Sequence, residues 1–375
     1  MRRHARVVLI LLALIAQPLR AIEAPKTVSP TSNPSAASPA WRAPAQEPHA
    51  LQPILARVTH RQLLANLNVE ESVIDLLARA EVAQAVAQLS AKAETNDAPT
   101  NIALVRVQNW CSRILPRERH RAPKLLEQLQ PQLSEPETAR LQLLVNLQLD
   151  YEAKARNSCG EARFDYRLIE AQLRDAADEG EPLSLTELAR IETRPARVEE
   201  LLQQAASKNY APALHALAMH RLIAVQRGER TSDVGSIRTL LKQAGRTSSR
   251  AKLDLANCMA VGCEGHPGDV GGALVFGLDA ARDGERDAYA SIARMPWAGR
   301  LPMEQRLAWQ YFGQRMNEAG CYGSDYLSMY ASLREAVLAY EKAIGADLQK
   351  PAEELAERYW RDYGARAQRE QKCSP

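Results

Sequence analysis

The segment that decides the fold runs from Leu253 to Ala290 and reads LDLANCMAVGCEGHPGDVGGALVFGLDAARDGERDAYA. Apolar residues recur in it at spacings of three and four, which is the period of an amphipathic helix. A stretch with glycine and proline interrupts this pattern once, and Gly284 interrupts it again. Small residues, above all the pair Ala280-Ala281, precede the second interruption. We therefore predict helices joined by short turns, with alanines where neighbouring helices touch.

The same order of small residues recurs along the chain in four further units. In each unit a small pair near the end of one helix is followed by a Leu-Ala, Ile-Ala or Tyr-Ala pair in the next. The first alanines of the units lie 29, 39, 36 and 39 residues apart, which is the range of helix-turn-helix solenoids. One such hairpin cannot bury its apolar face alone, so we expect the hairpins to stack into one continuous core. The units centre on Ala176-Ala177, Ala205-Ala206, Ala244-Gly245, Ala280-Ala281 and Ala319-Gly320.

The first segment resembles one nearly complete unit of the Sel-one-like repeats, a subgroup of the tetratricopeptide class. The resemblance covers roughly residues 175–335. The match is weaker for the unit around Ala205-Ala206, and the other units lack the glycine-containing loop. It implies an exported bacterial scaffold or adaptor that binds a protein partner in the cell envelope. Some exported members staple their hairpins with disulfides, which favours a bond between Cys258 and Cys263. The matching residues are Leu253, Leu255-Ala256, Met259, Gly262, Gly265, Pro267, Asp269, Ala273, Leu274, Gly277, Ala280-Ala281, Gly284 and Ala288.

The N-terminus has the pattern of a secretory signal peptide. Arg2, Arg3 and Arg6 precede ten uninterrupted apolar residues, Val7 to Ala16. A bilayer span needs roughly twenty apolar residues, so this stretch is too short to be a membrane anchor. We expect cleavage after Ala21, no transmembrane segment in the mature chain, and a periplasmic or secreted protein.

Charge and composition set the partner class and the domain boundaries. Removal of residues 1–21 takes away four arginines and no acid, which changes the net charge from +3 to −1. The mature chain lacks the basic excess of a nucleic-acid binder. Residues 22–53 hold seven prolines and almost no apolar run, which predicts a disordered tail. After it we expect an all-α protein with an N-terminal helical region at 54–170, a repeat array at 171–350, and a capping helix with a short tail at 351–375.

Six cysteines remain after signal removal, and an even number in an oxidising compartment indicates disulfides. Fifteen pairings are formally possible. A zinc site is the alternative, but no two cysteines have the spacing of a zinc knuckle and no histidine pair lies at matching spacing. The preferred pairing joins nearest neighbours in sequence: Cys111 with Cys159, Cys258 with Cys263, and Cys321 with Cys373.

No residue set has the pattern of an active site. His215 and His220 are five residues apart, whereas the metalloprotease motif needs four and an intervening Glu. The glycines between Gly268 and Gly272 follow a loop rather than a strand, so they do not form a dinucleotide cradle. Glu70-Glu71-Ser72 is similar to the Glu-Ser pair of lytic transglycosylases, but acids before an apolar run are typical of any helix start. We expect no catalytic residue, no metal site and no cofactor.

The aromatic residues gather in the last third of the chain. Interface hot spots favour Trp, Tyr and Arg, and helical arrays usually bind on their inner face. The alternative is that these rings form a heavier core beneath the capping helix. A protein-binding scaffold is the preferred function; a cell-wall-active hydrolase and a secreted effector or inhibitor are the alternatives. The candidate interface residues are Trp309, Tyr311, Tyr322, Tyr326 and Tyr330.

Overall fold

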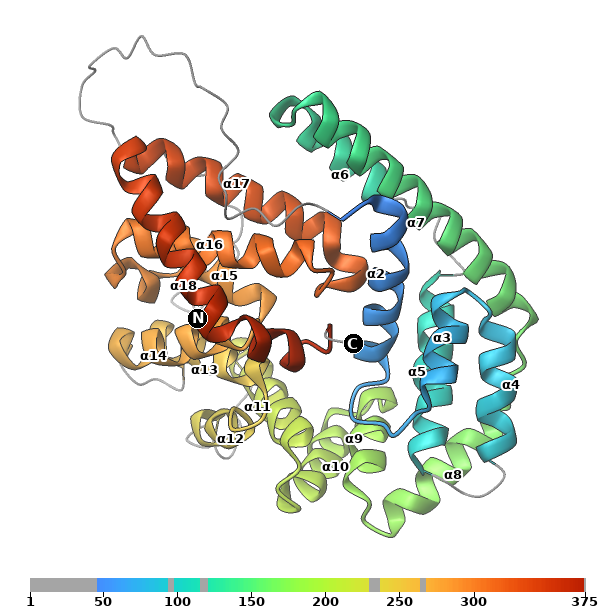
Figure 1. The fold of residues 1–375 in the computed structure, drawn as a ribbon. Coiled ribbons are helices and arrows are strands. Elements are labelled where there is room, and N and C mark those ends of the chain that lie inside the picture. Colours follow the sequence, from blue (N-terminus) through green and yellow to red (C-terminus); the bar gives the residue numbers. More distant parts are fainter. Residues whose placement is uncertain (1–45, 94–97, 115–120, 229–236, 264–267, 374–375) are drawn as a thin grey trace.

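The computed structural model describes residues 46–93, 98–114, 121–228, 237–263 and 268–373. Within these ranges every regular element is a helix, which confirms the all-α class (Figure 1). The signal peptide, most of the expected tail, and Gly265, His266 and Pro267 of the repeat loop lie outside them. In chain order the helices are α2 (Pro48–Leu63), α3 (Glu71–Ala78), α4 (Val82–Ala93), α5 (Ala98–Ile114), α6 (Arg121–Leu129), η1 (Gln130–Gln132), α7 (Glu135–Glu161), α8 (Tyr166–Asp178), α9 (Pro182–Ile191), α10 (Pro195–Ser207), α11 (Ala211–Gln226), α12 (Ile237–Ala244), α13 (Ser249–Val261), α14 (Val270–Arg282), α15 (Arg286–Arg294), η4 (Pro296–Arg300), α16 (Met303–Glu318), η5 (Gly323–Asp325), α17 (Tyr326–Ile344) and α18 (Ala346–Glu370).

From α8 to α17 the chain is a series of helices that each pack on the next, as an array of hairpins requires. The turn between α14 and α15 shows how a hairpin closes. Gly284 has φ +79°, a conformation that L side chains rarely adopt. Its amide donates to Ala281 O at 3.0 Å, and the amide of Glu285 donates to Ala280 O at 3.0 Å. These two bonds satisfy the last carbonyls of α14, so that α15 begins two residues after the glycine.

The small residues of the repeat lie where the helices touch. Side chains larger than alanine at these positions would hold the helix axes apart, because packed helices approach to 8–10 Å only as far as the contacting side chains allow. Ala177 is also buried, and Ala319 is partly buried. The repeat alanines with zero exposure include Ala205, Ala213, Ala218, Ala244, Ala251, Ala256, Ala280, Ala281 and Ala288.

The N-terminal region contains a hairpin of the same kind, formed by α3 and α4. The amide of Glu81 donates to Leu76 O at 2.9 Å, and that of Ala80 donates to Leu77 O at 3.0 Å. Ala80 takes the left-handed conformation with φ +65°. The sequence pattern did not reveal this unit, because an alanine stands where the turns after α8, α14 and α16 carry glycine.

Helix α2 begins at Pro48, several residues before 53, where the expected tail was to end. Leu51 is fully buried and Leu55 is buried, both against α7 and the start of α17. Figure 1 shows α2 lying between α7 on one side and the C-terminal helices on the other. The proline content of residues 22–53 concealed this helix, since Pro48 occupies its first turn, where a missing amide costs nothing.

The two ends of the described chain therefore meet, and we call the contact of α2 and α7 with residues 316–327 the seam. Thr59 Oγ1 accepts a hydrogen bond from the amide of Ser324 at 2.8 Å. Arg140 of α7 donates to Glu318 at 2.9 Å and to the hydroxyl of Tyr326 at 3.2 Å. These hydrogen bonds join residues far apart in the sequence, so the N-terminal helices lie against the last hairpin of the array.

The C-terminal helix α18 starts at Ala346, five residues before the expected Pro351, and it runs along α16 instead of covering only the end of the array. Trp309 of α16 stacks on Tyr359 of α18 with ring centroids 4.3 Å apart. Arg315 lies over the ring of Trp360 at 4.4 Å. The aromatic side chains of α18 thus complete the core of the last hairpin.

Three disulfides connect the cysteines as nearest neighbours in sequence. Their Cα atoms are 5.6, 5.0 and 4.7 Å apart, within the usual range for a disulfide. The first bond joins α5 to α7, the second closes the end of α13, and the third ties the end of α18 to the turn after α16, beside the seam. The pairs are Cys111 with Cys159, Cys258 with Cys263, and Cys321 with Cys373.

Candidate functional site

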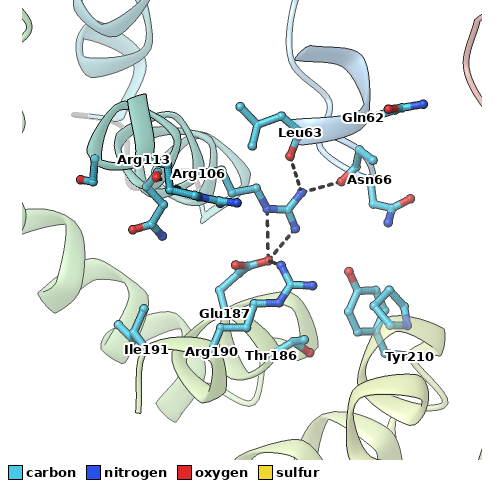
Figure 2. Close-up of a pocket in the computed structure, with 14 residues that line it drawn as sticks. Gln62, Leu63, Asn66, Arg106, Arg113, Thr186, Glu187, Arg190, Ile191 and Tyr210 are labelled. Atoms are coloured by element: carbon cyan, nitrogen blue, oxygen red, sulfur yellow. Dashed lines mark hydrogen bonds and ion pairs between the residues drawn. The ribbon is translucent and has the colours of Figure 1, made fainter. Parts of the chain in front are cut away.

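A cavity of about 720 Å³ lies where the end of α2, the C-terminal half of α5, α9 and the start of α11 approach one another (Figure 2). Most of the residues that line it are polar, with three arginines, one carboxylate and several amides and hydroxyls. Its volume falls in the range, roughly 300–1,000 Å³, of cavities that hold small ligands. The wall residues used below are Leu63, Arg106, Arg113, Glu187, Arg190 and Tyr210.

Arg106 joins three of the four walls. Its Nε and Nη2 donate to Oε1 of Glu187 at 3.2 and 2.5 Å. Its Nη1 donates to the carbonyls of Leu63 and Ala65 at 3.3 and 2.7 Å, which caps the C-terminal end of α2 (Figure 2). The side chains of Arg106 and Glu187 are only 12% and 5% exposed. This buried ion pair therefore fixes α2 against α5 and α9 and sets the shape of the cavity.

Arg190 and Arg113 are held more loosely. Arg190 donates from Nη1 to Oε1 of Glu187 at 2.7 Å, yet its side chain is 53% exposed. Arg113 is exposed, and its guanidinium bonds through Nε to Asn109 O of its own helix at 3.1 Å. Each guanidinium has five N–H donors. Both side chains therefore keep donors for a ligand in the cavity.

Charges of both signs act on the groups around the cavity. Burial first, and then the positive charge of Arg106, lower the pKa of Lys372. Tyr210 precedes the first residue of α11 and lines the cavity. The pKa of its phenol is raised, mainly by burial, so it is protonated at neutral pH and can donate a hydrogen bond. The one carboxylate among the lining residues, Glu187, is already engaged by two guanidinium groups.

The candidate interface aromatics do not line this cavity. Trp309, Tyr311, Tyr322 and Tyr326 are buried at 2% exposure or less, so they form core and not a docking surface. The hydroxyls of the three tyrosines bond inside the protein: that of Tyr311, for example, donates to Glu341 at 2.8 Å. Tyr330 is partly buried and donates to Glu137 of α7 at 3.2 Å, next to the seam. The expected interface is thus corrected, and the alternative of a heavier core beneath α18 describes these rings.

The two histidines on α11 face carboxylates that belong to two different helices. His215 Nε2 lies 2.8 Å from Asp254 of α13, and His220 Nε2 lies 3.7 Å from Glu199 of α10. In the part of the chain that the structure covers, no three His, Cys, Asp or Glu side chains come together as metal ligands. Gly272 donates its amide to Asp269 Oδ1 at 2.9 Å, which is a helix cap.

The acidic pair at the start of α3 lies on the surface. Glu71 is 65% exposed and pairs with Arg61 at 3.1 Å. Hydrogen bonding and charge from Lys92 lower the pKa of Glu70. A carboxyl that acts as general acid needs the opposite, an apolar enclosure that raises its pKa. The surroundings of this pair do not fit the transglycosylase role.

No protein-family model matches this chain. No curated protein matches it either. Among solved structures, one similar chain is a protective antigen present in uropathogenic Escherichia coli strains, described as displaying an SLR fold. It is 15% identical, the match covers 88% of this chain and 79% of that chain, and the TM-score is 0.33. A TM-score of this size does not establish a shared fold, so the architecture rests on the helices described above.

None of the described helices combines the length and apolar character needed to cross a membrane.

Sequence reasoning missed the arginines of the cavity. They come from α5 and α9, about 80 residues apart, and arginine is frequent throughout the chain. Nothing in the sequence marked Glu187 either, because Ser184 and Thr186 stand beside it in a segment of mixed polarity. A charged residue at a core position is rare unless it is paired, but only the structure shows that Glu187 is buried.

Proposed function

We propose that this chain is an exported helical-repeat protein, related to the Sel-one-like repeats, that binds a segment of a partner protein in the cavity between α2, α5, α9 and α11. The observation that carries the proposal is the cavity itself. It is large enough for several side chains and holds donors that the protein leaves unused. Helical arrays bind partners on surfaces formed by several repeats, and this cavity draws its walls from four helices.

The location outside the cytoplasm is part of the proposal. Three disulfides support it, since such bonds persist in oxidising compartments and are rare in the cytosol. The basic and apolar N-terminus supports it independently. The envelope of the bacterial host is therefore where a partner is to be sought.

A site-specific photocrosslinking amino acid tests this function in the native host. Ser112 is exposed and lines the cavity, whereas Val275 on α14 is 63% exposed and does not. We expect an adduct of one defined mass from position 112 and none from position 275. The absence of an adduct from position 112, or the same adducts from both positions, would contradict the proposal.

A further inference from the structure

The charges of the cavity are unbalanced. Arg106, Arg113 and Arg190 carry three positive charges, and Glu187 carries the one negative charge among the lining residues. The mature chain as a whole is nearly neutral, with a formal charge of −1 after removal of residues 1–21. The excess positive charge is therefore a local property of this cavity, and a ligand that enters it has to supply negative charge.

The two arginines that can meet a ligand differ from the one that cannot. Arg106 donates its N–H groups to Glu187 and to two backbone carbonyls at the C-terminal end of α2. Arg113 bonds only to Asn109 O in the described chain, and Arg190 uses one of its two terminal nitrogens. Their remaining N–H groups form planar pairs, the geometry that binds a carboxylate through two parallel hydrogen bonds.

The rest of the wall favours a peptide over a polyanion. Ile191 is 44% exposed beside Arg190, and Leu63 and Pro212 add apolar surface next to the polar groups. Walls that combine apolar and charged groups suit a peptide ligand that carries both apolar and charged side chains. Nucleic acids need basic charge extended along a groove, which this near-neutral protein does not offer.

We propose that the cavity takes the side-chain carboxylates of an acidic peptide segment, held by Arg113 and Arg190. The proposal deepens the proposed function and rests on it, because it names the chemistry of the partner segment that the cavity binds. Arg106 and Glu187 act as positioning residues that keep α2 and α9 at the walls.

Fluorescence anisotropy with the purified mature protein tests the proposal. The probe is a labelled, C-terminally amidated peptide rich in Glu and Asp, compared with the same peptide in which every acid is replaced by its amide. We expect binding of the acidic peptide only, weakened by added salt. Arg113→Gln and Arg190→Gln should each weaken it roughly tenfold, because each removes a charge-assisted pair of hydrogen bonds.

Two controls make the result specific to this cavity. Arg174→Gln removes an arginine on α8 that is 62% exposed and does not line the cavity, and it should leave the affinity unchanged. Arg113→Lys keeps the charge but loses the planar pair, so it should restore affinity only in part. Circular dichroism of each variant checks that the helices are intact.

Competition separates the sources of negative charge. Unlabelled acidic peptide should displace the probe, whereas inorganic phosphate and free succinate at the same carboxylate or phosphate concentration should not. Equal binding of the amide peptide, unchanged affinity in both Arg variants, or equal competition by phosphate would overturn the inference. If the photocrosslinked partner is found at position 112 while the acidic peptide fails, the proposed function stands and this inference falls.

Discussion

Replacement of Arg106 by alanine is the sharpest test of how the cavity is held together. The substitution removes four hydrogen bonds and leaves Glu187, 5% exposed, with Arg190 as its one remaining ion-pair partner. Loss of one member of a buried pair costs about 3–5 kcal/mol. Because Arg190 stays and the cavity admits water to the carbonyls of Leu63 and Ala65, we expect a value near the lower end, about 3 kcal/mol.

The assay is urea unfolding followed by circular dichroism with the disulfides intact. Arg190→Ala is the matched control, since it removes the other arginine from the same carboxylate oxygen but from a half-exposed position, and it should cost at most about 1 kcal/mol. The double replacement Arg106→Met with Glu187→Leu should recover most of the loss, because neither charge is then left unpaired. An Arg106→Ala chain as stable as the Arg190→Ala chain would refute the reasoning.

Burial lowers the pKa of His60 from 6.5 to about 4. Its neutral form therefore stabilises the fold fully above pH 6.5, and about 3 kcal/mol of stability is lost as the pH falls toward 4. Urea midpoints across this window should fall more steeply for the natural chain than for His60→Gln, and parallel curves would contradict this. In Gly277→Ala the new Cβ would overlap the ring of the fully buried Trp297, and thermal unfolding should show a loss of about 1–3 kcal/mol, whereas Gly299→Ala, which meets no atom within 4 Å, should show almost none. Leu51→Ala should cost about 2–5 kcal/mol in the same measurement, because Leu51 is fully buried at the seam; a neutral effect would mean that α2 is not part of the core. Peptide mapping without reduction should recover the pair Cys321 with Cys373, and any other partner for Cys321 would exclude the described seam.

Local rules made the hairpins predictable. The pair Ala280-Ala281 followed by Gly284 encodes both a close contact and a left-handed turn, and each feature is visible in the residue type. The hairpin of α3 and α4 has the same turn, but Ala80 adopts a conformation that its residue type does not announce. The helix pattern could therefore be read from the sequence, whereas the extent of the repeated turn could not.

Long-range packing was not predictable. The aromatic side chains of α16 looked suited to an interface, and only the course of α18 along α16 shows why Trp309 is buried. The cavity likewise depends on α2 folding back against the far end of the array. Its arginines carry no signal of their own, and Glu187 stands among Ser184 and Thr186, so its burial in an ion pair could not be read from the sequence.

Hydrogen exchange of the amides of α2 tests most directly whether the two ends of the array meet and so complete the cavity. A helix of 16 residues is marginal in water on its own, so its protection from exchange reports how firmly α3, α7 and η5 hold it. We predict that the amides from Leu51 to Leu63 exchange as slowly as those of α16, in the natural chain, and faster in Arg106→Ala. Rapid exchange of α2 beside slow exchange of α16 would show that the array is open and that the cavity lacks its fourth wall.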